Sequence, residues 1–374
     1  MLAAPHMVTT MLTPLRSRRV RGLVLRAGGL LVAVAGVAFL AQSFDLHAVA
    51  VALGRAEPAW LIPVMAILVG QLGLRALRLR TLLPRQAGEP GIGLRPLAGA
   101  MLVSGLANSV TPARVGDGVK CYLVSQNHRI SFSAVLGTIV LEHGIDCAIL
   151  AIIAASVAIA LAVSGPLYVF SVAAGIIGVG ILIALFVVRP AGLDARLRPG
   201  RAGRLARLVP FRARSALRVS LGHFGHGFRA IRHRRVLLAA LTMAVLLWLS
   251  DGLLFWLAAR SLGLAIDPAA AMFIAAGVAL TAAFPGAPGN VGTHEYTVVA
   301  AAAAVGLAGS GVLALAFLVH ALQLVPATLA GIAVMAVGGH RLTVPADATT
   351  AGVAEPEVGP VTRPPVRGPG CASA

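Results

Sequence analysis

The sequence predicts an all-α polytopic membrane protein with about six full transmembrane helices and two re-entrant hairpins in an inverted repeat. Three observations support this prediction. Of 374 residues, 58% are hydrophobic and 12% charged, roughly half the charged fraction of a soluble domain. Apolar runs long enough to span a membrane recur along the chain. A Pro/Gly-interrupted pattern also occurs twice, as PARVG at 112–116 and PGNVG at 288–292.

The apolar runs define the expected helices. Six are near or above the roughly 17–25 residues that span a bilayer, and they lie at 27–44, 58–74, 131–163, 166–188, 236–260 and 311–337. We interpret the first as an uncleaved span rather than a signal peptide, because Gln42, Ser43 and Phe44, which end the run, make a poor cleavage context. Two further runs, 94–111 and 269–308, end in or contain the repeated pattern.

Positive charge sets the expected orientation, because Lys and Arg are retained on the cytoplasmic side. The stretch 189–235 holds thirteen arginines against the lone acid Asp194 and is assigned to the cytoplasm. The basic N-terminus is cytoplasmic too, and so are the arginines after the second span, which are Arg75, Arg78, Arg80 and Arg85. Segment 94–111 lies between basic stretches that all belong inside, so we expect it to be re-entrant from the cytoplasm. The same reasoning makes 269–308 re-entrant from outside.

The expected organisation follows from these assignments. It comprises a basic N-terminus (1–20), a membrane domain (21–340) and a proline-rich tail (341–374) that cannot form a core. Within the membrane domain we expect a first repeat at 58–188, a cytoplasmic arginine-rich loop at 189–235 and a second repeat at 236–340. Both termini are then cytoplasmic.

The net charge of +18 does not indicate nucleic-acid binding, because the arginines lie beside apolar spans and no zinc-finger or aromatic RNA-binding pattern accompanies them. The three cysteines are far apart in the sequence and form no CxxC motif. We therefore expect membrane lipids, and not nucleic acid, as partners.

Polar residues gather around the first break. Pro112 and Gly116 interrupt the helix there, and helix N-termini that stop within a membrane favour an anionic guest. The candidate substrate-binding residues are Asn108, Arg114, Asp117 and Lys120, with Ser109 and Thr111 nearby. The alternative is an ordinary polar cytoplasmic loop.

A second constellation lies within the run 131–163. Glu142 and Asp146 are spaced i, i+4, which places both carboxylates on one helix face, with His143 beside them. Ionisable groups in a span mark a substrate or proton path, so these three residues are gating or proton-coupling candidates. The alternative is a structural ion pair, and the expected partners are Arg114 and either Arg75 or Arg78.

The second half carries a matching polar set directly after its glycines. The expected helix breaks are Pro285, Pro288, Gly289 and Gly292, and the substrate-binding candidates are Asn290 and Glu295, with Thr293, His294 and Tyr296 adjacent. Asp251, His320 and Gln323 are isolated polar residues. Each can equally form an interhelical hydrogen bond or contact a substrate.

Enzyme signatures are incomplete. His294 and Glu295 begin an H-E-x-x-H zinc motif, but Val298 occupies the closing position. Lys120 is the only lysine and is followed by Cys121, which excludes a Walker A loop. We therefore expect no metal, no cofactor and no catalytic residues.

Three stretches resemble the transmembrane region of lysylphosphatidylglycerol synthases and their flippase-like relatives. They are NSVTPARVGDGVKCY (108–122), TIVLEHGID (138–146) and FPGAPGNVGTHEY (284–296). Asp117 stands where that family usually has Glu, and His143 where Arg is common, whereas Glu142, Asp146 and Glu295 match. The departure at His143 removes a permanent charge and can make the site sensitive to pH.

The resemblance implies a stand-alone member, without the synthase domain, that translocates an anionic lipid or lipid-linked precursor between leaflets of the plasma membrane. The alternative is a membrane-embedded transferase, or an accessory subunit that partners an enzyme of envelope-lipid or glycan biosynthesis.

Overall fold

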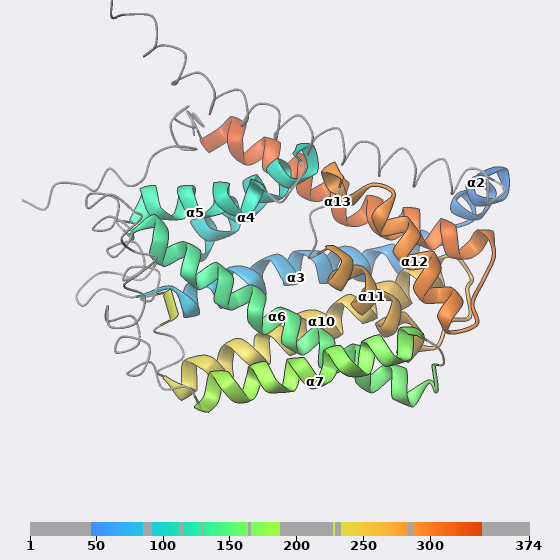
Figure 1. Ribbon diagram of the computed structural model, residues 1–374. Coiled ribbons are helices and arrows are strands. Elements are labelled where there is room, and N and C mark those ends of the chain that lie inside the picture. Colours follow the sequence, from blue (N-terminus) through green and yellow to red (C-terminus); the bar gives the residue numbers. More distant parts are fainter. Residues whose placement is uncertain are drawn as a thin grey trace, which may run out of the picture.

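The computed structural model describes residues 46–84, 92–111, 115–128, 130–163, 166–187, 227–228, 233–282 and 287–338. All of the regular elements in these ranges are helices (Figure 1). The expected basic N-terminus, the span at 27–44, most of the loop 189–235 and the tail 341–374 lie outside them.

Four described helices are long and apolar enough to cross a membrane. They are α3 (Pro58–Leu82), α6 (Phe132–Ala160), α10 (Arg234–Ser261) and α13 (Ser310–Gly338). At about 1.5 Å per residue, each is longer than the roughly 30 Å hydrocarbon core. Helix α7 (Pro166–Val187) covers a fifth expected span with a shorter apolar segment, Ser171–Ile183.

Two pairs of shorter helices form hairpins, each packed against itself. The first consists of α4 (Leu94–Val110) and α5 (Val115–His128). The second consists of α11 (Pro268–Ala282) and α12 (Thr293–Ala304), with the 3-10 turn η3 (Pro288–Asn290) between them. In Figure 1 the two hairpins enter the bundle from opposite ends.

The long helices α3 and α10 pack side by side and antiparallel at the centre. The backbone N–H of Glu57, which precedes α3, donates to the carbonyl of Ser261 at the end of α10 (2.8 Å). Around this pair the contacts are matched, since α4 packs on α13 whereas α11 packs on α6. The helix order long, short, short, long therefore occurs twice, with equivalent neighbours.

Glycines allow two of the closest helix contacts. A Cβ on Gly331 of α13 would lie 2.6 Å from the carbonyl oxygen of Leu102 in α4. A Cβ on Gly178 of α7 would lie 2.7 Å from the carbonyl oxygen of Ala148 in α6. Small residues that bring backbones this close are typical of helix packing in membranes.

The outer faces of the long helices are apolar. Ile62 and Val69 on α3, Ile176 on α7 and Leu329 on α13 are all well exposed. Large exposed apolar surfaces of this kind are unusual in a soluble monomer. These apolar faces, together with the long apolar helices, are those of an integral membrane protein. One further short helix, α2 (Leu46–Gly54), packs on α13.

Candidate functional site

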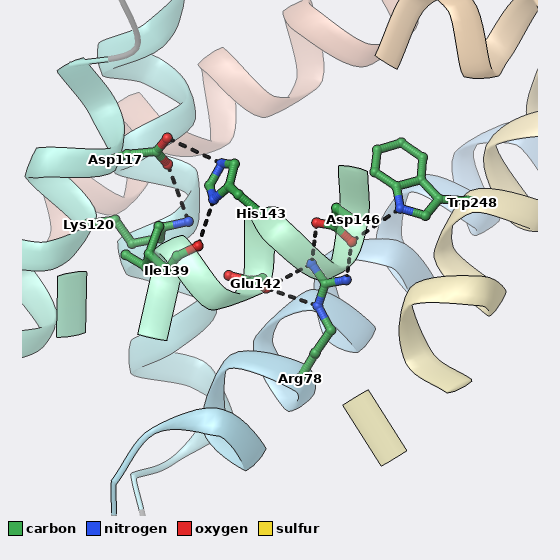
Figure 2. Close-up of polar contacts among 8 residues, drawn as sticks. All are labelled: Arg78, Asp117, Lys120, Ile139, Glu142, His143, Asp146 and Trp248. Carbon is green, nitrogen blue, oxygen red and sulfur yellow. Dashed lines mark hydrogen bonds and ion pairs between the residues drawn. The ribbon is translucent and has the colours of Figure 1, made fainter. Parts of the chain in front are cut away.

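A buried arginine joins α3 to α6 (Figure 2). The Nε–H of Arg78 donates to Glu142 Oε1 (3.0 Å), while Nη1 and Nη2 donate to the two oxygens of Asp146 (2.5 and 2.8 Å). Arg78 is only 2% exposed. The i, i+4 spacing of the two acids places both carboxylates on one face, as the sequence predicted. Of the expected partners, Arg78 pairs with both acids.

The surroundings of this triad extend to α10. The indole N–H of Trp248 donates to Asp146 Oδ1 (3.1 Å), and the Arg75 guanidinium lies over the Trp248 ring, 5.7 Å from its centroid. The predicted apolar run ends at residue 74, whereas helix α3 continues to Leu82, so Arg75, Arg78 and Arg80 lie on the helix and not in a loop after it. A buried arginine is tolerated there because two carboxylates neutralise it.

Asp117 lies in the first turn of α5 and faces two basic side chains (Figure 2). Its carboxylate is 3.4 Å from Lys120 Nζ and 3.5 Å from His143 Nε2. The other ring nitrogen of His143, Nδ1, donates to the Ile139 carbonyl (2.8 Å). A carbonyl can only accept, so His143 Nε2 carries a proton toward Asp117 only when the ring is charged.

The first break separates α4 from α5, and one side chain bridges it. The backbone N–H of Gly116 donates to Asn108 Oδ1 (2.7 Å). A Cβ on Gly116 would lie 2.1 Å from the carbonyl oxygen of Ser104, so only glycine fits this close approach. Pro112 and Arg114 lie outside the described residues.

The second break is a turn of residues with left-handed backbone. Gly289 (φ 62°), Asn290 (φ 58°) and Gly292 (φ 81°) lie between the helices α11 and α12. The N–H of Gly292 donates to Glu295 Oε2 (2.7 Å), and the Asn290 carbonyl accepts from the Thr293 hydroxyl (2.9 Å). Pro288 opens the turn, and Pro285 lies outside the described residues.

His320 connects this turn to α13. Its Nδ1 lies 2.5 Å from Glu295 Oε1, and its Nε2 donates to the Gly289 carbonyl (2.8 Å). His294 stacks on His320, with ring centroids 4.4 Å apart. The view of His320 as an isolated polar residue is therefore wrong, because α12 and α13 converge and bring three ionisable side chains together.

The acid and histidine pairs occupy equivalent places in the two halves. Asp117 and Glu295 are each the third residue of the second hairpin helix, α5 and α12. His143 is the twelfth residue of α6 and His320 the eleventh of α13, and each contacts the acid of its own half. The sequence set out Asn290 and Glu295 as the counterpart of the first cluster, but it did not pair either acid with a histidine.

Other predicted polar residues have local roles. Asp251 on α10 accepts from Gln71 on α3 (3.0 Å), so it forms an interhelical hydrogen bond. Gln323 is half-buried on α13. Sequence reasoning missed Trp248 and Gln71, because the residues of these pairs are 102 and 180 positions apart and no local pattern links them.

The zinc motif that the sequence leaves incomplete is partly completed in space. His294, Glu295 and His320 each offer one ligand atom, and these atoms lie within 4.8 Å of one another. The third donor comes from α13 instead of from position 298. The group is therefore one that can hold a metal ion.

Comparison with known proteins identifies the family. Residues 26–331 match the family described as Lysylphosphatidylglycerol synthase TM region. The chain belongs to this family. The match confirms the resemblance predicted from three motifs. It includes both hairpins, the long helices α3, α6 and α10, and α13 as far as residue 331.

One curated relative of this family member is named Glycosyltransferase AglD and comes from Haloferax volcanii. The two are 27% identical over 333 residues, which cover 82% of this chain and 53% of the relative. The chain thus spans about half the length of the curated relative it matches. No solved structure matches the chain.

Proposed function

We propose that this chain translocates an anionic lipid or lipid-linked precursor between the leaflets of the plasma membrane, between two re-entrant hairpins of an inverted repeat. The observation that carries this proposal is that the two breaks meet. Turn η3 packs on α4, and a Cβ on Gly289 would lie 3.5 Å from the carbonyl oxygen of Ser109. Paired broken segments at one depth are typical of transporter binding sites.

The inverted repeat is supported by the order and direction of the helices. Helices α3, α4, α5 and α6 match α10, α11, α12 and α13 in order and length class, and α3 packs antiparallel to α10, as expected for two sets related by an approximate two-fold axis. Such an axis in the membrane plane gives the halves opposite topology. The arginine-rich loop 189–235 then lies in the cytoplasm, with both termini.

The charges near the first break indicate which groups meet a lipid phosphate. Arg78 already serves two carboxylates, so it is not available to a substrate. Lys120 is 3.4 Å from Asp117, which is its one ion pair among the residues that the structure describes, and Arg114 precedes it by six positions in the sequence. We assign the phosphate to Arg114 and Lys120, with Asn108 holding the break and Asn290 facing it from the other half. Asp117 lies beside Lys120. Glu295 is not available to the phosphate, because its two oxygens already contact Gly292 and His320.

The structure also favours one of the two readings of Glu142 and Asp146. Both acids neutralise Arg78, which supports a structural ion pair as their main role. His143 does not take part in the ion pairs with Arg78. It is the stronger gating candidate, because the Nε2 atom can donate to Asp117 only when the ring is charged.

Reconstitution tests the proposal. Full-length protein is placed in liposomes with labelled anionic phospholipids or polyprenyl phosphates, and the fraction reaching the opposite leaflet is measured by reduction of the outer label. We expect Arg114→Ala and Lys120→Met to slow translocation about tenfold or more, equivalent to about 1.4 kcal/mol. Arg234→Ala, at an exposed position on α10, is the matched control. Translocation no faster than in protein-free liposomes, for every lipid, would contradict the proposal.

A second candidate function is that of a membrane-embedded transferase or of an accessory subunit for an enzyme that makes envelope lipids or glycans. The observation in its favour is the name of the relative, although the matched part is only half of that protein. Lipid masses in a deletion strain distinguish the two functions. A missing modified lipid supports transfer, whereas unchanged masses with an altered leaflet distribution support translocation.

A further inference from the structure

The second half contains three buried side chains whose donor atoms converge. His294, Glu295 and His320 are 5%, 3% and 8% exposed, and one ligand atom of each lies within 4.8 Å of the others. They come from the start of α12 and the middle of α13. They face Phe255 of α10, whose ring stacks beyond His294, so the cluster has an apolar wall.

The backbone fixes which atoms of Glu295 and His320 remain available. Because the Gly289 carbonyl can only accept, His320 Nε2 carries the proton, and Nδ1 is turned toward Glu295. Glu295 Oε2 is occupied by the Gly292 N–H, which leaves Oε1 facing that Nδ1 at 2.5 Å. Two lone pairs directed at one point require a cation between them, either a proton or a metal ion.

His294 supplies the independent observation. Neither of its ring nitrogens has a hydrogen-bond partner among the residues that the structure describes, although both are buried. Buried polar atoms are nearly always paired. The His294 ring lies beside a histidine and a carboxylate, and both of its nitrogens lack a partner among the described residues. One of these nitrogens is therefore available to bind a ligand from outside the chain.

We propose that His294, Glu295 and His320 bind one divalent transition-metal ion, and that Zn²⁺ fits best. Two imidazoles and one carboxylate form a donor set that zinc uses, with a fourth position left open, whereas Mg²⁺ and Ca²⁺ prefer oxygen ligands. The bonds from His320 to Gly289 and from Glu295 to Gly292 are the outer-shell contacts that orient metal ligands. This site goes beyond the proposed lipid translocation and does not depend on it.

Only small movements are needed to load the site. Ligands about 2.0–2.2 Å from zinc lie roughly 3.4 Å apart in a tetrahedron. The Glu295 to His320 contact must therefore open from 2.5 Å, while His294 turns inward. Binding displaces the proton shared by these two groups. The loaded site would join α12, α13 and the turn at Gly289.

Metal content tests the proposal directly. The full chain is purified in detergent with a histidine-free affinity tag, incubated with Zn²⁺, desalted and analysed by elemental mass spectrometry. We expect about one zinc per chain, retained in His47→Ala, at an exposed position on α2. His294→Phe and Glu295→Gln should each retain about a tenth of that amount or less, because each removes a ligand.

His294→Phe is the decisive variant, because His294 makes no hydrogen bond to the described residues and phenylalanine keeps the stacked ring. Its elution on size exclusion should therefore match the unaltered protein. Replacing zinc with Co²⁺ should give the visible absorption of a tetrahedral site, which His294→Phe abolishes. Unaltered protein that retains no zinc, or His294→Phe that retains as much as the unaltered protein, overturns the proposal.

Discussion

Each half of the described bundle contains a buried polar cluster, and the hydrogen-bonding groups of the two clusters are satisfied in different ways. In the first half, Arg78 bonds two carboxylates and Trp248 completes the set. In the second half there is no arginine in the cluster, and His294 keeps both nitrogens unbonded among the described residues. The charged groups of the Arg78 cluster are therefore all bonded to one another. The cluster of His294, Glu295 and His320 still has two ring nitrogens without a partner among the described residues. The two halves share the same order of long and short helices, but their polar clusters differ in chemistry.

Removing the cation of the first cluster should have the largest effect on folding. Arg78→Met leaves two buried carboxylates facing each other, which should lower the free energy of unfolding by about 3–5 kcal/mol. Thermal unfolding in detergent, followed by tryptophan fluorescence, measures the loss.

The compensated variant sharpens this prediction. Arg78→Met combined with Glu142→Met and Asp146→Leu removes the carboxylates as well, and it should recover most of the stability. If Arg78→Met alone unfolds like the unaltered protein, the triad is not the joint between α3 and α6.

The first break should be sensitive to a single methyl group. Gly116→Ala places a Cβ 2.1 Å from the Ser104 carbonyl oxygen, which should cost about 3 kcal/mol by overpacking. Gly118→Ala is the matched control, since nothing lies within 4 Å of its Cβ. Equal unfolding temperatures for the two variants would show that the break is not closely packed.

The two acid and histidine pairs should differ in stability. Glu295→Gln disturbs a buried pair and the hydrogen bond from Gly292, and should cost about 2 kcal/mol. Asp117→Asn is the comparison variant, because Asp117 contacts the histidine of the other half. If Glu295→Gln lowers the free energy of unfolding less than Asp117→Asn does, the pair of Glu295 and His320 is not the more stabilising of the two.

Asp117→Asn should have the smallest effect. The side chains of Asp117 and His143 are 27% and 38% exposed, so their ion pair should contribute less than about 1 kcal/mol. The contact of Asp117 with Lys120 is long, at 3.4 Å, and the amide oxygen of asparagine can still accept from the ammonium group. Salt should reduce this contribution further. Unfolding measured at low and high ionic strength checks both statements, and a large, salt-independent loss would contradict them.

Much of the helical framework follows from hydrophobicity alone. The runs predicted at 131–163, 236–260 and 311–337 agree with α6, α10 and α13 within a few residues. The end of α3 was misplaced, because hydropathy places arginines outside a span and cannot show that Arg78 has two carboxylate partners across the bundle. The short helices α4, α11 and α12 lie within the two interrupted runs that the sequence predicts, because proline and glycine disturb helices locally. Helix α5 was not predicted, since its stretch was interpreted as a basic loop.

The candidate sites could be predicted only in part. The spacing of Glu142 and Asp146 is local and visible in the sequence, and so are the glycines of both breaks. The contact of Glu295 with His320 and that of Asp117 with His143 depend on how a hairpin folds back on the next helix. Asn108, Asn290 and Lys120 are placed near the breaks, but their contact with a substrate stays a prediction.

The hydrogen bond from His320 to the Gly289 carbonyl has a mechanical consequence. Gly289 lies in the turn that touches α4, and His320 lies within a helix 29 residues long. A rotation or tilt of α13 would therefore change the distance between His320 and the Gly289 carbonyl, next to the contact of turn η3 with α4. A single imidazole therefore links the middle of a 29-residue helix to the turn between α11 and α12.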